Sequence, residues 1–306
     1  MKNNFAIVGV GNHAKKKIIP FIESTKNKIF AVFSSQKHSY KTINKLDSNL
    51  DLIPKETIFY ISSPPHAHYE QSKKIVKNNF SILCEKPSFL NLREFFNIKK
   101  ILKKDNFFIE VIIYKYSLLF KHFLNTWKLK KKNISKVEIN FLIPKFSSSG
   151  FRKNKYKWSA CLYDIGIYPI SLLNILNIKN YKIAIKKILY NKNKSIKRIF
   201  LIIKNYKHEF IINIGENKIY KNNIILYTKK NEKITFDYFF YGIKKNKKIS
   251  YNNKSKIIKD RNCFEIILKK NKTYWLKNKY KELNSIYKNI VLLKKIEKKI
   301  SGYQSY

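Results

Sequence analysis

Arginine is scarce in this chain: only four of its 65 basic residues are arginine, although the formal net charge is +46. Arginine is the side chain best shaped to bind phosphates and guanine edges. The lysines are spread along the whole chain instead of forming one basic arm, and the over-used residue types share A/T-rich codons, so genomic base composition explains the charge. We therefore expect no specific nucleic-acid partner; a lysine-rich nucleic-acid-binding protein is kept as the second alternative function.

Cysteine is also scarce, and no apolar run is long enough to cross a bilayer. The three cysteines, Cys84, Cys161 and Cys263, lie far apart and form no CxxC pair. The sequence thus predicts neither a disulfide scaffold nor a metal site. The N-terminus leads directly into an apolar run without the layout of a signal peptide. We expect a cytoplasmic protein with no membrane partner.

Glycine and proline are rare as well, with seven of each in 306 residues. The 44% of hydrophobic and 15% of aromatic residues are typical of a folded protein. In such a chain the remaining glycines are expected where the backbone needs them, in tight turns or at close approaches. Their positions are therefore informative about function.

Short apolar segments alternate with amphipathic segments in the first third of the chain. This alternation is typical of βαβ units with a parallel sheet, and it predicts a dinucleotide-binding Rossmann domain over residues 1–117. Strands are predicted at 5–10, 29–33, 57–62, 80–84 and 107–114, and helices at 13–26, 67–79 and 90–104.

The pattern changes after a predicted helix near 117–131, because strand-like segments now follow one another. Such a succession favours an antiparallel sheet, so we predict a C-terminal α+β domain over 118–306 on a mostly antiparallel open sheet, and the α/β class for the chain. The strands are predicted at 137–144, 181–190, 198–204, 208–214, 223–228, 233–240 and 263–268, the helices at 164–177 and 279–300, and a solvated loop at 244–255.

A GxGxxA motif lies between the first predicted strand and the first predicted helix. Gly9 permits a tight turn, Gly11 lets the backbone approach a pyrophosphate, and Ala14 lets the helix pack closely. The helix start at Asn12 and His13 supplies free N–H groups for the phosphates. The motif predicts a dinucleotide site, and an ordinary strand-to-helix turn is the alternative.

The second predicted strand does not end in the acid that binds the ribose 2′-hydroxyl in many NAD-dependent proteins. It runs instead into Ser34, Ser35 and, two residues later, Lys37. Small hydroxyls followed by a base suit a 2′-phosphate, so NADP is the favoured cofactor and NAD the alternative. These residues could equally be polar turn residues.

Two further segments complete an ordered set: Ser62-Ser63-Pro64-Pro65-His66-Ala67-His68, and Cys84-Glu85-Lys86-Pro87. With the GxGxxA motif, they resemble the Gfo/Idh/MocA oxidoreductase family, which pairs a (S/T)P-x-x-x-H turn with an EKP tripeptide. The resemblance implies that Lys86 lies beside the nicotinamide. It also makes Ser63, Pro64, His68 and Glu85 candidate cofactor contacts, although His68 suits a residue that shapes the turn at least as well.

A third motif is Asp164-Ile165-Gly166-Ile167-Tyr168, similar to the D-x-G-x-(H/Y) motif of the family. The tyrosine form resembles the branch with sugar-nucleotide 3-ketoreductases, dihydrodiol dehydrogenase and glucose–fructose oxidoreductase. Asp164 and Tyr168 are four residues apart and would share one face of a helix. The resemblance implies that Tyr168 exchanges a proton with the substrate, Lys86 stabilises the phenolate and Asp164 orients them. A packing role is the alternative for Tyr168.

The chain departs from the family just before this motif, where Trp158-Ser159-Ala160 replaces a glycine triplet. Three side chains there would crowd backbone that runs close to the active site in relatives. We therefore expect an NAD(P)-dependent oxidoreductase that acts on a sugar or sugar-nucleotide carbonyl or hydroxyl. The first alternative is a degenerate dinucleotide-binding protein without turnover. The resemblance also implies a homo-oligomer, a dimer or tetramer.

Overall fold

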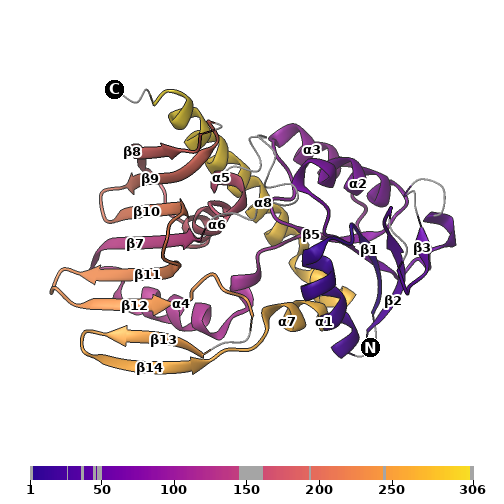
Figure 1. Cartoon of the computed structure of the whole chain (residues 1–306), viewed down its shortest axis with the longest axis horizontal. Helices are drawn as coiled ribbons and strands as arrows, with labels where there is room; N and C mark the ends of the chain where they lie inside the picture. Colours follow the sequence, from indigo (N-terminus) through magenta and orange to yellow (C-terminus); the bar gives the residue numbers. More distant parts are fainter. Residues whose placement is uncertain are drawn as a thin grey trace. The chain divides into compact units, whose positions relative to one another are not determined.

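The computed structural model describes residues 3–25, 27–35, 38–43, 46, 50–144, 161–192, 194–243 and 246–303. The chain forms two compact units (Figure 1). The first unit comprises Met1–Ile112 and Phe264–Ile290, and the second comprises Ile113–Cys263 and Val291–Tyr306. The first unit is thus discontinuous in sequence, whereas the predicted domain boundary at 117/118 was a single one.

A parallel sheet forms the centre of the first unit. Among the described residues it has six strands in the order β3-β2-β1-β4-β5-β6, and all neighbouring strands run parallel. The chain starts in the middle of the sheet and adds strands first on one side and then on the other, which is the doubly wound Rossmann arrangement. This fold was predicted and is confirmed. Its strands are β1 (Asn4–Val8), β2 (Lys28–Phe33), β3 (Thr42–Ile43), β4 (Ile58–Ile61), β5 (Ser81–Glu85) and β6 (Phe108–Val111).

Helices cover this sheet, and the strands between them are apolar because they are buried on both faces. Every residue of β4 and of β6 is buried. The helices are η1 (Ala14–Ile18) with α1 (Ile19–Ser24), η2 (Leu50–Leu52), α2 (Pro65–Lys77), α3 (Leu92–Ile101), α7 (Cys263–Leu268) and the first part of α8 (Lys272–Ser301). From α8, Leu283, Ile286 and Ile290 enter the same core as β1, β4 and β5.

The second unit is built on a mostly antiparallel sheet, as predicted. Its order in the described residues is β14-β13-β12-β11-β7-β10-β9-β8, and β7 pairs with β10 in parallel while the other neighbours are antiparallel. The strands are β7 (Ile134–Ile143), β8 (Lys182–Tyr190), β9 (Ile196–Lys204), β10 (Glu209–Glu216), β11 (Lys221–Thr228), β12 (Lys233–Asp237), β13 (Asn246–Tyr251) and β14 (Lys254–Lys259).

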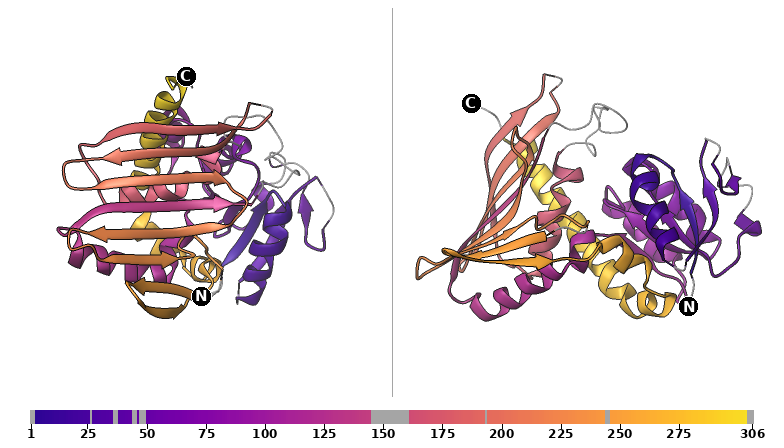
Figure 2. Two further views of the ribbon diagram at one scale, coloured as in Figure 1. Left: turned by 60° about the vertical axis from the view of Figure 1, so that its left-hand side comes forward. Right: turned by 60° about the horizontal axis from the view of Figure 1, so that its bottom comes forward.

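The helices of the second unit lie on one face of this sheet (Figure 2). They are η3 (Ile113–Tyr116), α4 (Leu118–Lys130), α5 (Cys161–Asp164), α6 (Ile167–Ile175) and the part of α8 from Val291 onward. Aromatic rings form much of the contact, since Phe123 packs against Phe236 and Trp127 against Phe210. The alternating burial along β9 and β10 follows from this one-sided cover.

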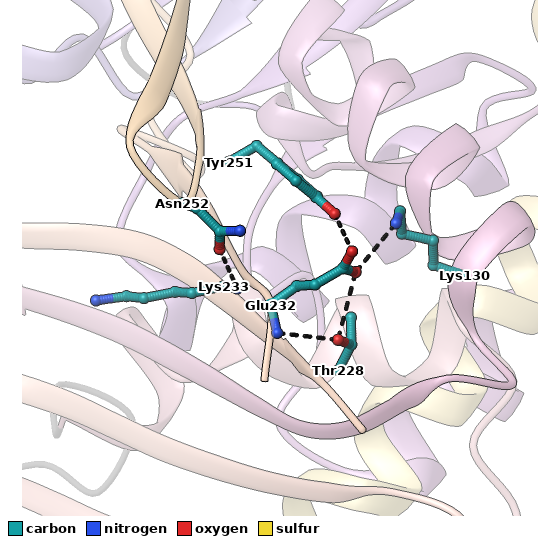
Figure 3. A network of polar contacts seen from close by, with 6 residues as sticks. All are labelled: Lys130, Thr228, Glu232, Lys233, Tyr251 and Asn252. Atoms are coloured by element: carbon teal, nitrogen blue, oxygen red, sulfur yellow. Dashed lines mark hydrogen bonds and ion pairs between the residues drawn. The ribbon is translucent and has the colours of Figure 1, made fainter. Parts of the chain in front are cut away.

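One end of the sheet is joined to α4 through Glu232, which follows β11 (Figure 3). Its carboxylate accepts hydrogen bonds from Tyr251 and Thr228 and pairs with Lys130 at 3.2 Å. The Tyr251 hydrogen bond is the largest cause, and Lys130 a further one, of a lowered pKa of Glu232. The network connects α4, the β11–β12 turn and β13.

Two predicted elements are wrong. The expected loop at 244–255 contains β13 and the start of β14, because Lys247 is buried in an ion pair with Asp260 at 2.8 Å. The expected strand at 263–268 is α7, in which Phe264, Ile267 and Leu268 are buried at helical spacing. The apolar composition of this segment is compatible with a strand or a helix, so composition alone does not distinguish the two.

No helix in the described ranges combines the length and the apolar composition that a membrane span requires.

Candidate functional site

The turn after β1 requires its first glycine. Gly9 has φ +84°, which side chains rarely tolerate, and a Cβ there would lie 2.7 Å from the backbone N and Cα of Ser63. The approach is close because Val8 ends β1 and Ser62 directly follows the neighbouring β4, with the Ser62 N–H donating to the Val8 carbonyl at 2.8 Å. Gly9 therefore allows two functional turns to touch.

The rest of the GxGxxA turn is open on one side and packed on the other. A Cβ on Gly11 would meet nothing within 4 Å, and Asn12 and His13 are exposed. Ala14 is fully buried under the first turn of the helix. No side chain caps this helix start at His13, so its first N–H groups are not taken up by a capping side chain, as an anion-binding helix start needs.

The segment after β2 holds the candidates for the 2′-phosphate. The Ser34 N–H donates to the Ile43 carbonyl at 3.2 Å, and the Ser34 hydroxyl lies 3.1 Å from His38 Nε2. Ser35 is exposed. Lys37 lies outside the described residues. Ser34 thus has a hydrogen-bond partner of its own, and the NADP preference stays a prediction.

His68 joins the two turns that the family motifs occupy. It is fully buried in α2, with Nε2 2.8 Å from the Ser63 carbonyl oxygen and Nδ1 2.9 Å from the Pro87 carbonyl oxygen. Burial lowers the pKa of His68, although its carbonyl partners act in the opposite direction. Pro64 forms the N-cap of the same helix, with a proline at its start. This geometry favours the interpretation of His68 as a residue that shapes the turn.

Glu85 connects the end of β5 to the GxGxxA turn. Its Oε1 accepts hydrogen bonds from the Tyr60 hydroxyl at 2.6 Å and from His13 Nε2 at 3.1 Å. Burial acts to raise the pKa of Glu85, but the charge and hydrogen bond of His13 and the bond from Tyr60 outweigh it, so the pKa is lowered. Lys86 follows directly and is half-buried.

Asp164 and Tyr168 belong to the second unit, on two short helices instead of the one predicted at 164–177. Asp164 ends α5 and Tyr168 is in the first turn of α6. Gly166, between them, is required for packing, since a Cβ there would lie 2.4 Å from the Leu162 carbonyl oxygen and 2.8 Å from Ile214 Cδ1. Asp164 is buried, with 5% of its surface exposed. The Trp158-Ser159-Ala160 segment lies outside the described residues.

Tyr168 lies in a cluster of aromatic rings and is 8% exposed. Its ring centroid is 5.4 Å from that of Phe141, 5.8 Å from Phe240 and 6.0 Å from Tyr114. The Tyr114 hydroxyl bonds to Ser171 at 2.9 Å, and burial raises the pKa of Tyr114 well above its ordinary value. Tyr114 is therefore a second, neutral tyrosine in the same cluster, and no motif in the sequence pointed to it.

Sequence reasoning also missed Tyr60 and Glu110. Glu110 is 4% exposed on β6, where its carboxyl group accepts hydrogen bonds from the N–H and hydroxyl of Ser88. A signal for it exists in the sequence, because a single acid in an apolar, buried strand needs hydrogen-bond donors. Tyr60 carries no such signal, since tyrosine packs in many buried strands.

The residues of the first unit fit a dinucleotide. The space beside Gly11 is open, the helix start is uncapped, and Ser62 Oγ is a buried hydroxyl without a hydrogen-bond partner in the described structure at the same edge of the sheet. Pyrophosphate groups bind at such edges, where strands end and a helix begins. In the part of the chain that the structure describes, no three histidine, cysteine or acidic side chains are grouped as metal ligands would be.

Comparison with known proteins relates the N-terminal part of the chain to a known family. Residues 3–112 match the model of the Gfo/Idh/MocA family, described as an oxidoreductase family with an NAD-binding Rossmann fold. The match confirms the predicted resemblance for residues 3–112, which lie in the first unit. The parallel sheet of the first unit lies within the matched residues, in agreement with the Rossmann fold of that family.

Solved structures share the fold of the whole chain at low sequence identity. The 3-ketoreductase KijD10 from Actinomadura kijaniata, in complex with NADP and TDP-benzene, has a TM-score of 0.79 at 11% identity over 96% of each chain. Aldose–aldose oxidoreductase from Caulobacter crescentus, complexed with glycerol, has a TM-score of 0.81 at 13% identity over 99% of each chain. Further structures of the ketoreductase carry a tyrosine replaced by phenylalanine or a lysine replaced by alanine. No curated protein sequence matches the chain.

Proposed function

We propose that this protein is an NADP-linked oxidoreductase that transfers a hydride between the nicotinamide and a carbonyl or hydroxyl carbon of a sugar or sugar nucleotide. The observation that carries the proposal is the connected edge of the first sheet. Gly9 contacts Ser63, His68 lies within hydrogen-bonding distance of the carbonyl oxygens of Ser63 and Pro87, and Glu85 bonds to His13. These contacts connect the GxGxxA turn to the segment that carries Lys86.

The substrate class and the cofactor rest on structural relatives. The ketoreductase complex contains NADP and a TDP derivative, and the Caulobacter relative acts on aldoses. Both cover almost the whole chain, so the second unit as well as the first has the relatives' architecture. A bound nicotinamide supplies hydride exchange at its C4 atom.

We assign the proton chemistry to this chain's own residues. In the direction of reduction, the Tyr168 hydroxyl donates a proton to the carbonyl oxygen, and the Lys86 ammonium stabilises the negative charge that remains. Asp164 orients these groups. Gly9, Gly11, Asn12, His13 and Ala14 hold the pyrophosphate, and Ser34, Ser35 and Lys37 the 2′-phosphate.

A second candidate function is dinucleotide binding without turnover. The packing of Tyr168 favours it, because a ring surrounded by Tyr114, Phe141 and Phe240 has a structural role regardless of chemistry. The cytoplasmic location and the homo-oligomer remain predictions under both functions.

Turnover of keto sugars and keto-sugar nucleotides, with NADPH and NADH compared, tests the proposal. We expect a preference for NADPH, and a fall in kcat of roughly two to four orders of magnitude for Tyr168→Phe, the usual range for general acid–base catalysis. Lys86→Ala should lower kcat at least as much. The kcat of the double variant should be little lower than that of either single variant if the two residues act as one unit.

Tyr114→Phe is the matched control, because it removes one hydroxyl from the same aromatic cluster. It should lower the melting temperature through the lost bond to Ser171 and leave kcat close to wild type. Full activity of Tyr168→Phe would refute the assigned proton donor. A wild type that binds NADPH and turns over no carbonyl substrate would establish the second candidate instead.

A further inference from the structure

The backbone that directly follows Lys86 is held by two buried polar side chains from different elements. On one side, His68 Nδ1 of α2 lies 2.9 Å from the Pro87 carbonyl oxygen. On the other, Glu110 Oε1 of β6 accepts hydrogen bonds from the Ser88 N–H at 2.9 Å and from the Ser88 hydroxyl at 3.0 Å. His68 and Ser88 are fully buried, and Glu110 is 4% exposed.

Glu110 is the less expected of the two. It is the one acid of β6, whose other residues are Phe108, Ile109 and Val111, and it pairs in register with Cys84 of β5. Burying a carboxyl group costs free energy unless donors surround it. Here three donors do, because Glu110 Oε2 also accepts from Asn289 Nδ2 of α8 at 3.2 Å.

The segment before Lys86 is held as well. Glu85 accepts hydrogen bonds from Tyr60 and His13. Lys86 therefore lies between two anchored neighbours, on a chain of Glu85, Lys86, Pro87 and Ser88. A lysine side chain has four flexible methylene groups, so fixing its backbone on both sides limits the positions that its ammonium can reach.

We propose that Glu110 is a positioning residue for Lys86, acting through Ser88, with His68 holding Pro87 from the other side. This inference rests on the proposed role of Lys86. In this role Glu110 does not contact the substrate. It determines the position of the Lys86 ammonium when the carbonyl oxygen of the substrate develops negative charge. A displacement of about 1 Å in such a group costs on the order of 100-fold in rate.

The test compares two substitutions at one position. Glu110→Leu keeps much of the volume and removes all acceptors, so we expect kcat to fall about 10- to 100-fold, with the Kd for NADPH within twofold of wild type. Glu110→Gln keeps one oxygen for Ser88, and the Asn289 amide can turn its oxygen toward the new NH2 group. It should retain at least a third of the wild-type kcat.

Lys279→Met is the matched control in the same unit. Lys279 is also buried, and its ammonium donates to the carbonyl oxygens of Lys103, Lys104 and Asn106 at 2.8–3.0 Å, before β6 begins. Its loss should lower the melting temperature as Glu110→Leu does, but leave kcat unchanged. A purely structural role for Glu110 would give both variants the same kcat, and that result would overturn the inference.

Two further measurements keep the outcomes separate. If Glu110→Leu does not fold, Ser88→Ala removes only the hydroxyl bond, and kcat should fall about two- to fivefold; an unchanged kcat would count against the inference. The second measurement does not depend on enzyme turnover: it is the rate at which an amine-reactive reagent modifies Lys86, followed by peptide mass spectrometry. It should change in Glu110→Leu and not in Lys279→Met. A wild type without turnover defeats the proposed function, whereas equal modification rates in both variants defeat the positioning role.

Discussion

Buried polar groups serve different purposes in the two units of this protein. In the first unit they lie beside turns that carry candidate site residues: buried His68 contacts two of these turns, buried Glu110 binds the segment after Lys86, and the partly buried Glu85 bonds to His13 of the GxGxxA turn. In the second unit the buried pair Lys247–Asp260 holds a sheet-edge hairpin, and Tyr168 is packed among rings. The partners differ: in the first unit His68 and Glu110 contact backbone groups next to candidate site residues, whereas in the second unit Lys247 pairs with the Asp260 side chain.

The two glycines of the first unit should give the largest contrast. Gly11→Val places a side chain in open space, so the fold should remain while NADPH binding weakens about 10- to 100-fold. Gly9→Val clashes with Ser63 and has an unfavourable φ, so it should cost roughly 2–5 kcal/mol of stability. Thermal melts and fluorescence titration of NADPH separate the two effects. Normal NADPH binding by a folded Gly11→Val protein would show that the turn does not bind the pyrophosphate.

The second contrast breaks the buried ion pair of the second unit. Lys247→Met leaves Asp260 buried without its cation and should cost about 3–5 kcal/mol in the free energy of unfolding. Asp260 Oδ1 still accepts from the N–H groups of Leu118 and Arg261, and an asparagine oxygen can do the same. Adding Asp260→Asn should therefore recover much of the loss in denaturant melts. NADPH affinity of the folded protein should stay unchanged; a loss of affinity would contradict the division of roles between the units.

The smallest expected effect is at the Glu232 network of the second unit (Figure 3). Because Tyr251 and Lys130 lower the pKa of Glu232 below its ordinary value of 4.5, the carboxylate stabilises the folded state at neutral pH. That contribution disappears as the pH falls through the lowered pKa, below about 4.5. Glu232→Gln should lower the melting temperature by at most about 2 °C at pH 7, and the difference should vanish at low pH.

Glu209→Gln provides the control for Glu232, since Glu209 lies 3.8 Å from Lys204 at the exposed end of β10. Its melting temperature should equal that of wild type at pH 7. A difference for Glu232→Gln that grows toward acid pH would contradict the assigned direction of the pKa shift.

Local sequence predicted the fold of the first unit well. Its strands are continuous apolar runs, its turns carry rare glycines, and its motifs follow strand ends, so each element is encoded by residues adjacent in the chain. The order of Gly9, Ser63 and Lys86 in the sequence therefore implied that they meet at one edge of a parallel sheet. Their roles in cofactor binding and catalysis remain predictions, as do those of Asp164 and Tyr168.

Tertiary structure decided what depends on distant partners. The β13–β14 hairpin forms from a lysine- and asparagine-rich segment in which Lys247 pairs with Asp260. Helix α7 replaces a predicted strand because its apolar residues are buried at helical spacing, with Phe264 stacked on Phe21 of α1. Likewise, the positioning role that we infer for Glu110 depends on its hydrogen bonds to Ser88 and Asn289, which are 22 and 179 residues away in the sequence. Sequence periodicity reports which face of an element is apolar, whereas the partner of a buried charge is set by the packing of segments that local pattern does not connect.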